Sequence, residues 1–503
     1  MILVLFLQIF LGIGLLRTLK YQTTLFKFLA LSTLIGITLV STIPFILELV
    51  KIPITSNNII VSTIIMTVLL HIAPLYNCFK HKTPYISLQL EKFQVYELPG
   101  LSLTGYFLYI SLWRSYNVPT YARDVMSGPE PIADWAIKEH TLINSVFNID
   151  LFSTNNQFKS PFLADLQIIY KMAGFDFGGL WIGIMAIAFT IFVYCILKEF
   201  MHPLLASVAV VIMTAAPEMF AYTFMYLFDY PNMTLWIAAV YFVHQLIQQP
   251  NRTNLFLSAI LFGLGTYIRA ETLIITVFMV MLYAIIAYIK KTNIKFIISA
   301  AVIIGIFTFI GYFVPTQLYN NYYLPQEYAI GTLINDNLSN IGAYVDRIYE
   351  VTDTLLLAEN GMNFWLYNIK IFLFLFLIEI IYIIFSKKYK DVNWHYWFGA
   401  VLVIYLGVTF MGFLMPLMDI KHSTKRAMFK LIPLLYLFVA NFHIIKLLSE
   451  KLTNWENTKF NLKLPRENQP QTIAVVNQPS SKNRGTYPTN NSINNKIKPK
   501  KRK

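Results

Sequence analysis

The sequence predicts an all-α, polytopic membrane protein with about thirteen transmembrane helices and two long extracytoplasmic loops. Hydrophobic residues make up 56% of the 503 residues and charged residues only 13%, which differs from the composition of a soluble globular protein. Apolar stretches repeatedly reach the length that a helix needs to cross a bilayer. Basic residues gather in alternate connections between these stretches, as the positive-inside rule predicts for a membrane protein.

The predicted spans cover most of the chain. They lie near residues 2–16, 25–50, 58–76, 98–113, 179–198, 204–224, 230–248, 254–268, 272–289, 295–315, 363–385, 396–415 and 428–447. The first span has no small-residue cleavage site, so we expect a retained helix and not a signal peptide. Basic connections lie at residues 17–20, 80–92, 252, 290–295 and 387–390. We expect them to be cytoplasmic, with the N-terminus outside the plasma membrane and the C-terminal tail inside.

The net charge of +14 does not indicate a nucleic-acid partner. The excess positive charge lies mostly in the short connections and in the C-terminal tail. From Ser449 onward Asn, Gln, Pro, Ser and Lys dominate, which predicts a disordered tail whose basic end contacts anionic lipid of the bilayer. Cys78 and Cys195 lie beside or inside apolar stretches. We therefore expect neither a disulfide nor a thiolate metal site.

The first long loop, residues 114–178, contains several candidate catalytic acids. Its charged or titratable residues include Asp124, Glu130, Asp134, Lys138, Glu139 and His140. Pro129 and Pro131 flank Glu130 and are expected to hold it in an extended or turned backbone instead of a helix. A helix that begins after them would place Asp134 and Lys138 on one face. Glu130 is therefore a candidate general base, although an ordinary solvated loop explains the same acids equally well.

Three further polar segments are expected on the same side of the membrane. Asp229 precedes one span, and a cap of the following helix is its simpler interpretation. Arg269 and Glu271 lie between two closely spaced spans, where a local ion pair is an alternative to a functional role. The third segment precedes the last span and departs from the positive-inside pattern, which favours phosphate binding there. Its basic or titratable residues are Lys421, His422, Lys425 and Arg426.

The remaining polar segments are less specific. The second long loop, residues 316–362, is acidic, and residues 161–170 predict an interfacial helix on the outer surface. Four isolated histidines are expected to serve in packing, because no pair has zinc-ligand spacing. These are His71, His202, His244 and His443. The sequence contains no Walker loop or dinucleotide fingerprint, so energy is expected to come from the substrate or from a gradient.

A series of short motifs, taken in order, resembles the GT-C superfamily of polyprenyl-phosphate-sugar-dependent glycosyltransferases. This superfamily includes protein O-mannosyltransferases and lipid A aminoarabinose transferases. The matching segments are Glu130 with Trp135, Ala136 and Lys138; Pro161–Leu163 with Gly174; Asp229–Pro231; Gly263–Glu271; and Lys425–Arg426 with Pro433. The leading acid of the first motif is usually Asp, so Asp124 or Asp134 could replace Glu130 as its counterpart. The family loop usually follows the first span, whereas about three extra predicted spans precede it here, which indicates an N-terminal addition.

The resemblance implies that a sugar passes from a polyprenyl-phosphate donor to an extracytoplasmic acceptor by direct displacement at the anomeric carbon. The acceptor would be a protein, a lipid or a glycan. Glu130, or else Asp124 or Asp134, would take the acceptor's proton. Asp229 would orient the acceptor or hold Mg²⁺ or Mn²⁺. The cations that would bind the donor phosphate are Lys425, Arg426 and Arg269, with Lys421 and His422 beside them.

The same resemblance divides the chain into three parts. Residues 1–97 would form N-terminal transmembrane helices, residues 98–447 a catalytic transmembrane domain, and residues 448–503 a cytoplasmic tail. Trp135, Lys138 and Glu271 would complete the active site. The alternative function is a transporter or flippase of lipid-linked saccharides, which would place polar groups near the bilayer midplane. A non-catalytic scaffold or a polymer ligase is a third possibility.

Overall fold

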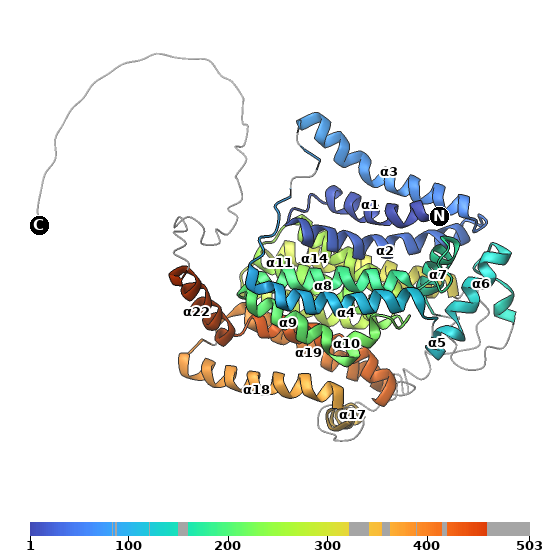
Figure 1. Ribbon diagram of the computed structural model, residues 1–503. Helices are drawn as coiled ribbons and strands as arrows, with labels where there is room; N and C mark the ends of the chain where they lie inside the picture. The colour runs from blue at the N-terminus through green and yellow to red at the C-terminus, as the bar shows by residue number, and fades with distance from the viewer. Residues whose placement is uncertain are drawn as a thin grey trace, which may run out of the picture. The chain divides into compact units, whose positions relative to one another are not determined.

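The computed structural model describes residues 1–82, 84–85, 88–119, 121–148, 159–320, 342–354, 363–388, 390–414 and 420–459. In these residues the chain is helical, and its only β-type pairing is an isolated bridge between Thr24 and Gln89. Contacts divide the chain into residues 1–453 and 454–503. The first unit contains the helix bundle and the candidate site (Figure 1). The prediction of a disordered tail from Ser449 onward is wrong for residues 449–459, which belong to the helix His443–Lys459, and the rest of the tail lies outside the described residues.

The helices follow one another closely. Helices of the first half are α1 (Ile2–Thr18), α2 (Leu25–Leu49), α3 (Ser56–His81), α4 (Leu98–Asn117), α5 (Arg123–Met126), α6 (Pro129–Glu139), α7 (Phe162–Met172), α8 (Leu180–Phe200), α9 (Pro203–Ala215), α10 (Pro217–Tyr222) and α11 (Asp229–Gln248). Those of the second half are α12 (Arg252–Ile268), α13 (Thr272–Ile289), α14 (Ile294–Tyr312), α17 (Gly342–Thr352), α18 (Asn363–Ser386), α19 (Val392–Leu414), α20 (Lys425–Met428), α21 (Leu431–Ala440) and α22 (His443–Lys459). Each predicted span coincides with one or more of them.

Several of these helices suit a membrane. Six of the described helices are long and apolar enough to cross a bilayer, or up to seven if a bent pair over residues 425–440 and 443–458 forms one span. Helices α1 and α9 are apolar but shorter. The all-helical membrane fold is therefore confirmed, whereas the count of about thirteen spans stays a prediction.

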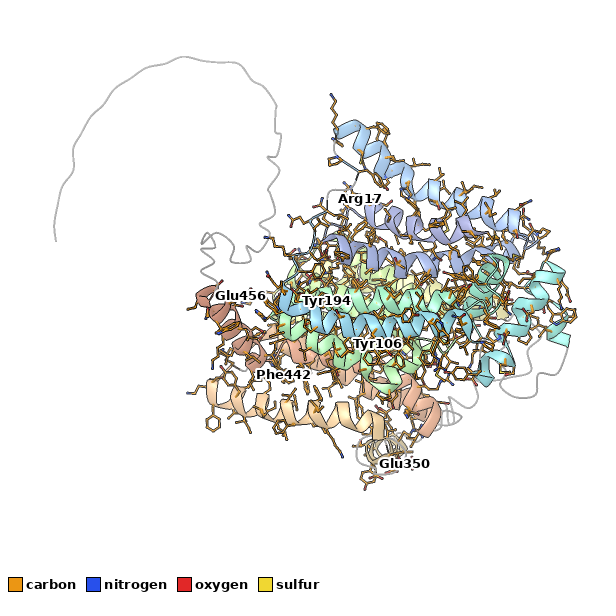
Figure 2. All side chains as sticks on the ribbon, in the orientation of Figure 1. Arg17, Tyr106, Tyr194, Glu350, Phe442 and Glu456 are labelled. Carbon is orange, nitrogen blue, oxygen red and sulfur yellow. The ribbon has the colours of Figure 1, made fainter. Side chains whose placement is uncertain are left out.

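Small residues bring two N-terminal helices into close contact. A Cβ atom built on Gly12 of α1 would lie 1.8 Å from the backbone oxygen of Ser32, and one on Gly36 of α2 would lie 1.8 Å from that of Gln8. Glycine at these positions therefore lets the two helix backbones touch, as is common between transmembrane helices. Figure 2 shows the side chains of the described residues on the helices of the bundle.

Helix α6 begins at Pro129 and includes Glu130. The prediction that the two prolines would keep Glu130 out of a helix is wrong. The amides of the first helical turn have no acceptor within the helix, so Pro129 and Pro131 lose no hydrogen bond there. The expected helix that carries Asp134 and Lys138 is present, and it starts earlier than the sequence indicated.

Helix α7 is buried on all sides. Every residue from Phe162 to Tyr170 is buried, and the helix packs against α2 and α6. The predicted helix is therefore confirmed, but its predicted position on the outer surface is wrong. Apolar side chains occur all around this helix, which is typical of a core helix. Its one acid, Asp165, accepts a hydrogen bond from the Tyr267 hydroxyl at 3.1 Å.

Candidate active site

Four segments that are distant in sequence bring charged side chains together at one end of the bundle, near α5, α6 and α7 (Figure 1). Arg426 of α20 donates to Asp124 Oδ2 of α5 at 2.7 Å and, through Nη2, to Asp229 Oδ2 of α11 at 2.9 Å. Arg269, which follows α12, donates to the other Asp229 oxygen, Oδ1. We refer to Asp124, Asp229, Arg269 and Arg426 as the charged cluster.

Helix ends explain why these side chains meet. Asp229 is the first residue of α11, where a carboxylate is favoured by the helix dipole. Its side chain is only 1% exposed, and two guanidinium groups neutralise its charge. Arg269 ends α12 in an extended conformation, which leaves only two residues before α13 and directs the chain into a tight turn.

Arg269 also makes the local ion pair that the sequence allowed. Its Nη2 atom donates to Glu271 Oε2 at 2.7 Å. Glu271 Oε1 in turn lies 3.6 Å from Nζ of Lys430, a lysine that is 2% exposed. Arg269 therefore joins the charged cluster to a second acid and a second cation, so the functional and structural interpretations of this segment are compatible.

Three charged residues near the charged cluster were not predicted as site residues. Lys159 lies close enough to Asp124, Asp229, Arg269 and Arg426 to interact with all four. Glu218 lies 3.5 Å from Lys425 Nζ, and Lys430 contacts Glu271. An ionisable residue inside an apolar span signals function, and Glu218 and Lys430 both lie inside predicted spans. Of these three residues, Lys159 is the one that does not lie inside a predicted span and so had no such sequence signal.

The surroundings of Lys159 change its ionisation. Desolvation by nearby protein atoms and the positive charges of Arg269 and Arg426 lower the pKa of Lys159 to about 8, although its side chain remains open to solvent. Asp124 and Asp229 oppose this shift. The ammonium group is therefore charged at neutral pH and loses its proton in mildly alkaline solution.

Glu130 and Asp134 share a different partner. Lys171 of α7 lies 2.6 Å from Asp134 Oδ1 and 3.8 Å from Glu130 Oε1. This contact joins α6 to α7, and burial raises the pKa of Glu130 while Lys171 opposes that shift. Trp135 is 38% exposed, and the Lys138 ammonium lies 4.8 Å from the centre of its ring. The structure therefore brings Asp124, and not Glu130 or Asp134, into ion-pair contact with Arg426.

The segment before α20 is only partly described. The backbone of η6 (Ile420–Thr424) forms a π-helical turn, whereas the side chains of Lys421 and His422 lie outside the described residues. Arg347 of α17 donates to Thr424 Oγ1 at 2.9 Å. A helix of the second long loop is thus attached to the segment that leads into Lys425 and Arg426.

Asp229 does not fit the divalent-metal role considered for it. Both of its carboxylate oxygens accept hydrogen bonds from arginine, and a cation there would face two guanidinium groups. The described residues also contain no group of three or more His, Cys, Asp or Glu residues that could hold a metal ion. The site instead offers cations to an anion, and carboxylates that can accept a proton or a hydrogen bond.

An all-helical membrane protein with arginines and carboxylates gathered at the ends of its helices is suited to a substrate that is both anionic and lipid-borne. Residues 166–313, under a third of the chain, match the family described as dolichyl-phosphate-mannose-protein mannosyltransferase. The match includes Asp229, Arg269 and Glu271. It confirms the resemblance to GT-C enzymes and supports a multi-pass membrane glycosyltransferase of the GT-C type. No curated protein and no solved structure matched the chain.

Proposed function

We propose that this protein transfers a sugar from a polyprenyl-phosphate donor to an extracytoplasmic acceptor, and that the charged cluster is its active site. The observation that carries the proposal is the position of Arg426, which contacts a buried carboxylate and a partly exposed one at the same time. A phosphate held there would be next to an acid that can serve as a base. The acceptor would be a protein, a lipid or a glycan.

The donor phosphate would bind to the cations of the site. A guanidinium group holds two phosphate oxygens, whereas an ammonium group acts as a point charge. Arg426 and Arg269 would therefore orient the phosphate, with Lys425 and Lys159 adding charge. Negative charge grows on the phosphate oxygens as the bond to the anomeric carbon breaks, so fixed cations stabilise the transition state more than the ground state.

Asp124 is the base that the geometry favours. Its side chain is 31% exposed, whereas that of Asp229 is 1% exposed, so of the two acids in the charged cluster Asp124 is the one open to an acceptor. The donor phosphate would take the place of Asp124 on Arg426 and release an ionised carboxylate beside the sugar. That carboxylate would accept the acceptor's proton as the acceptor oxygen attacks and the polyprenyl phosphate leaves. Glu130, expected from the motif spacing, is the alternative base.

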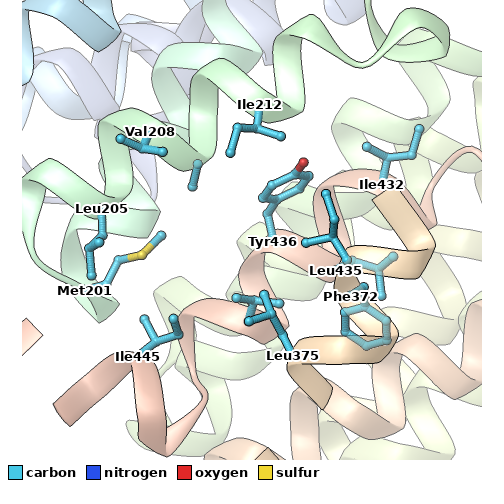
Figure 3. A pocket seen from close by; sticks show the side chains of 13 residues that line it. Met201, Leu205, Val208, Ile212, Phe372, Leu375, Ile432, Leu435, Tyr436 and Ile445 are labelled. Atoms are coloured by element: carbon cyan, nitrogen blue, oxygen red, sulfur yellow. The ribbon is translucent and has the colours of Figure 1, made fainter. Parts of the chain in front are cut away.

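An apolar cavity offers a place for the polyprenyl chain (Figure 3). It has a volume of about 270 Å³ and is lined by side chains of α9, α18 and α21 and their flanks. Figure 3 shows Ile212, Ile432 and Tyr436 toward one end and Met201 and Ile445 toward the other. Ile212 and Ile432 are each six residues from a charged residue of the site, Glu218 and Arg426 respectively. A lipid chain in this cavity would thus extend away from a phosphate at the charged cluster.

We propose that the site faces the extracytoplasmic side of the plasma membrane. The connections rich in lysine and arginine are expected in the cytoplasm, and the charged cluster lies at the other ends of the helices. A flippase would need polar groups near the middle of the bilayer. The residues of the charged cluster lie in or beside helix ends instead, which favours transfer over transport.

Donor use by Arg426 variants tests this proposal. With purified protein and a polyprenyl-phosphate sugar, Arg426→Ala should raise the donor KM about ten- to a hundredfold, because charge-assisted hydrogen bonds are lost. Arg426→Lys should raise it less. Arg252→Ala, at an exposed arginine that begins α12, is the matched control and should behave like the wild type. An equal donor KM in Arg426→Ala and in the wild type would show that Arg426 does not bind the donor.

A further inference from the structure

Glu218 is a buried carboxylate for which the described residues supply an ion-pair partner but no hydrogen-bond partner. It is the second residue of α10 and is 9% exposed. Neither of its carboxylate oxygens has a hydrogen-bond partner among the described residues. Lys425 Nζ lies 3.5 Å from Oε1, which supplies a compensating charge without hydrogen-bond geometry. Buried polar atoms are nearly always hydrogen-bonded, so these two oxygens need an explanation.

The position of Glu218 connects it to the charged cluster. Lys425, its ion-pair partner, directly precedes Arg426. Tyr222 lies one turn after Glu218 on the same face of α10, and its hydroxyl interacts electrostatically with Glu218 and with Asp229, Arg269 and Arg426. The Tyr222 ring packs against Phe429, with ring centres 4.6 Å apart. Glu218 and Tyr222 therefore border the proposed phosphate site.

The chemistry of an ionised carboxylate limits what it can bind. It accepts hydrogen bonds and donates none, so its ligand must supply N–H or O–H groups. In a polyprenyl-phosphate donor the sugar is bonded directly to the phosphate, so sugar hydroxyls lie next to whatever holds that phosphate. A carboxylate whose two oxygens lack hydrogen-bond partners among the described residues can accept from two neighbouring hydroxyl groups. A half-buried aromatic ring beside it offers a surface for the apolar face of a sugar ring.

We propose that Glu218, with Tyr222 beside it, recognises the sugar of the donor. Its oxygens accept hydrogen bonds from sugar hydroxyls, and the Lys425 ammonium, 3.5 Å from Oε1, orients the carboxylate. Glu218 is thus a specificity-determining residue, and the phosphate-binding arginines do not distinguish one sugar from another. This inference rests on the proposed function, because it requires a lipid-phosphate donor at the charged cluster.

The test compares lipids with and without a sugar. Binding of polyprenyl phosphate, and of the same lipid carrying mannose, glucose, galactose or N-acetylglucosamine, is measured on the purified full-length protein in lipid nanodiscs. The wild type should bind at least one sugar-bearing lipid more tightly than the bare lipid. Glu218→Gln should reduce that preference about tenfold or more, since hydrogen bonds to a charged group are lost. Its affinity for the bare lipid should stay within about threefold of wild type.

Controls separate this role from a structural one. Glu350→Gln, at an exposed position of α17 (Figure 2), is the matched variant and should keep the wild-type preference. Arg426→Ala should weaken binding of both lipids. An equal loss of affinity for both lipids in Glu218→Gln would overturn the inference. So would a wild-type protein that prefers no sugar-bearing lipid, or a Glu218→Gln variant that changes only the acceptor KM. A wild type that binds neither lipid would contradict the proposed function itself.

Discussion

At the scale of single residues, the site depends on Arg426. Its guanidinium group contacts Asp124 and Asp229 from separate nitrogen atoms, which a lysine ammonium could not do with the same fixed geometry. Three chain segments that are distant in sequence are thereby joined by one side chain. This arrangement gives a physical reason for a basic residue on the side that we propose to be extracytoplasmic, where the positive-inside rule disfavours it.

We expect Lys159 to give the proposed reaction a pH dependence. Its lowered pKa of about 8 means that it is protonated at pH 7 and largely neutral at pH 9. A neutral amine no longer attracts phosphate, so kcat/KM for the donor should fall as pH rises through about 8. Lys159→Arg should abolish that fall, because a guanidinium stays charged. Lys159→Met should show no alkaline fall, with a kcat/KM below pH 8 as low as the value that the wild type reaches at high pH.

Steady-state kinetics at a series of pH values provide the measurement. The product must be followed at saturating acceptor, so that the profile reports the donor site. If kcat/KM falls at alkaline pH in both variants as it does in the wild type, Lys159 does not titrate in the free enzyme. The fall would then belong to another group or to the acceptor.

At the scale of helices, the sequence predicts where a helix forms better than it predicts what surrounds that helix. Hydrophobic runs locate each long helix, because length and apolar content are local properties. The environment of α7 depends on which neighbours cover it, and an interfacial position was predicted although its apolar residues lie all around the helix, as in a protein core. The start of α6 was missed because two prolines look like helix breakers unless they fall in the first turn.

The contacts between the site residues are also harder to predict from the sequence than the residues themselves. Asp229, Arg269, Glu271 and Arg426 were predicted from their positions at span ends, and the structure brings Asp229, Arg269 and Arg426 into direct contact. Which acid of the first loop meets them depends on tertiary packing. The motif spacing favoured Glu130, whereas Lys171 of α7 engages Glu130 and leaves Asp124 as the partner of Arg426. Long-range ion pairs of this kind have no local sequence signal.

At the scale of the whole molecule, the orientation in the membrane decides which face carries out the reaction. We expect Tyr121→Cys and Tyr349→Cys, each in a background without Cys78 and Cys195, to react with an impermeant thiol reagent in intact cells. Both tyrosines are exposed and lie in the long loops. Lys451→Cys, in the exposed part of α22, should react only after permeabilisation. The reverse pattern would place the site in the cytoplasm.

The central claim is that the charged cluster is the catalytic site of a lipid-phosphate-dependent glycosyltransferase, with Asp124 as its base. Sugar transfer by purified protein tests it most directly, with Asp124→Asn and Glu130→Gln compared against the wild type under saturating donor. Asparagine keeps the shape of aspartate but cannot accept the proton. Asp124→Asn should therefore lower kcat about 10²- to 10⁴-fold, while Glu130→Gln keeps most of the activity. Normal transfer by Asp124→Asn would contradict the account, and a collapse in Glu130→Gln alone would assign the base to Glu130.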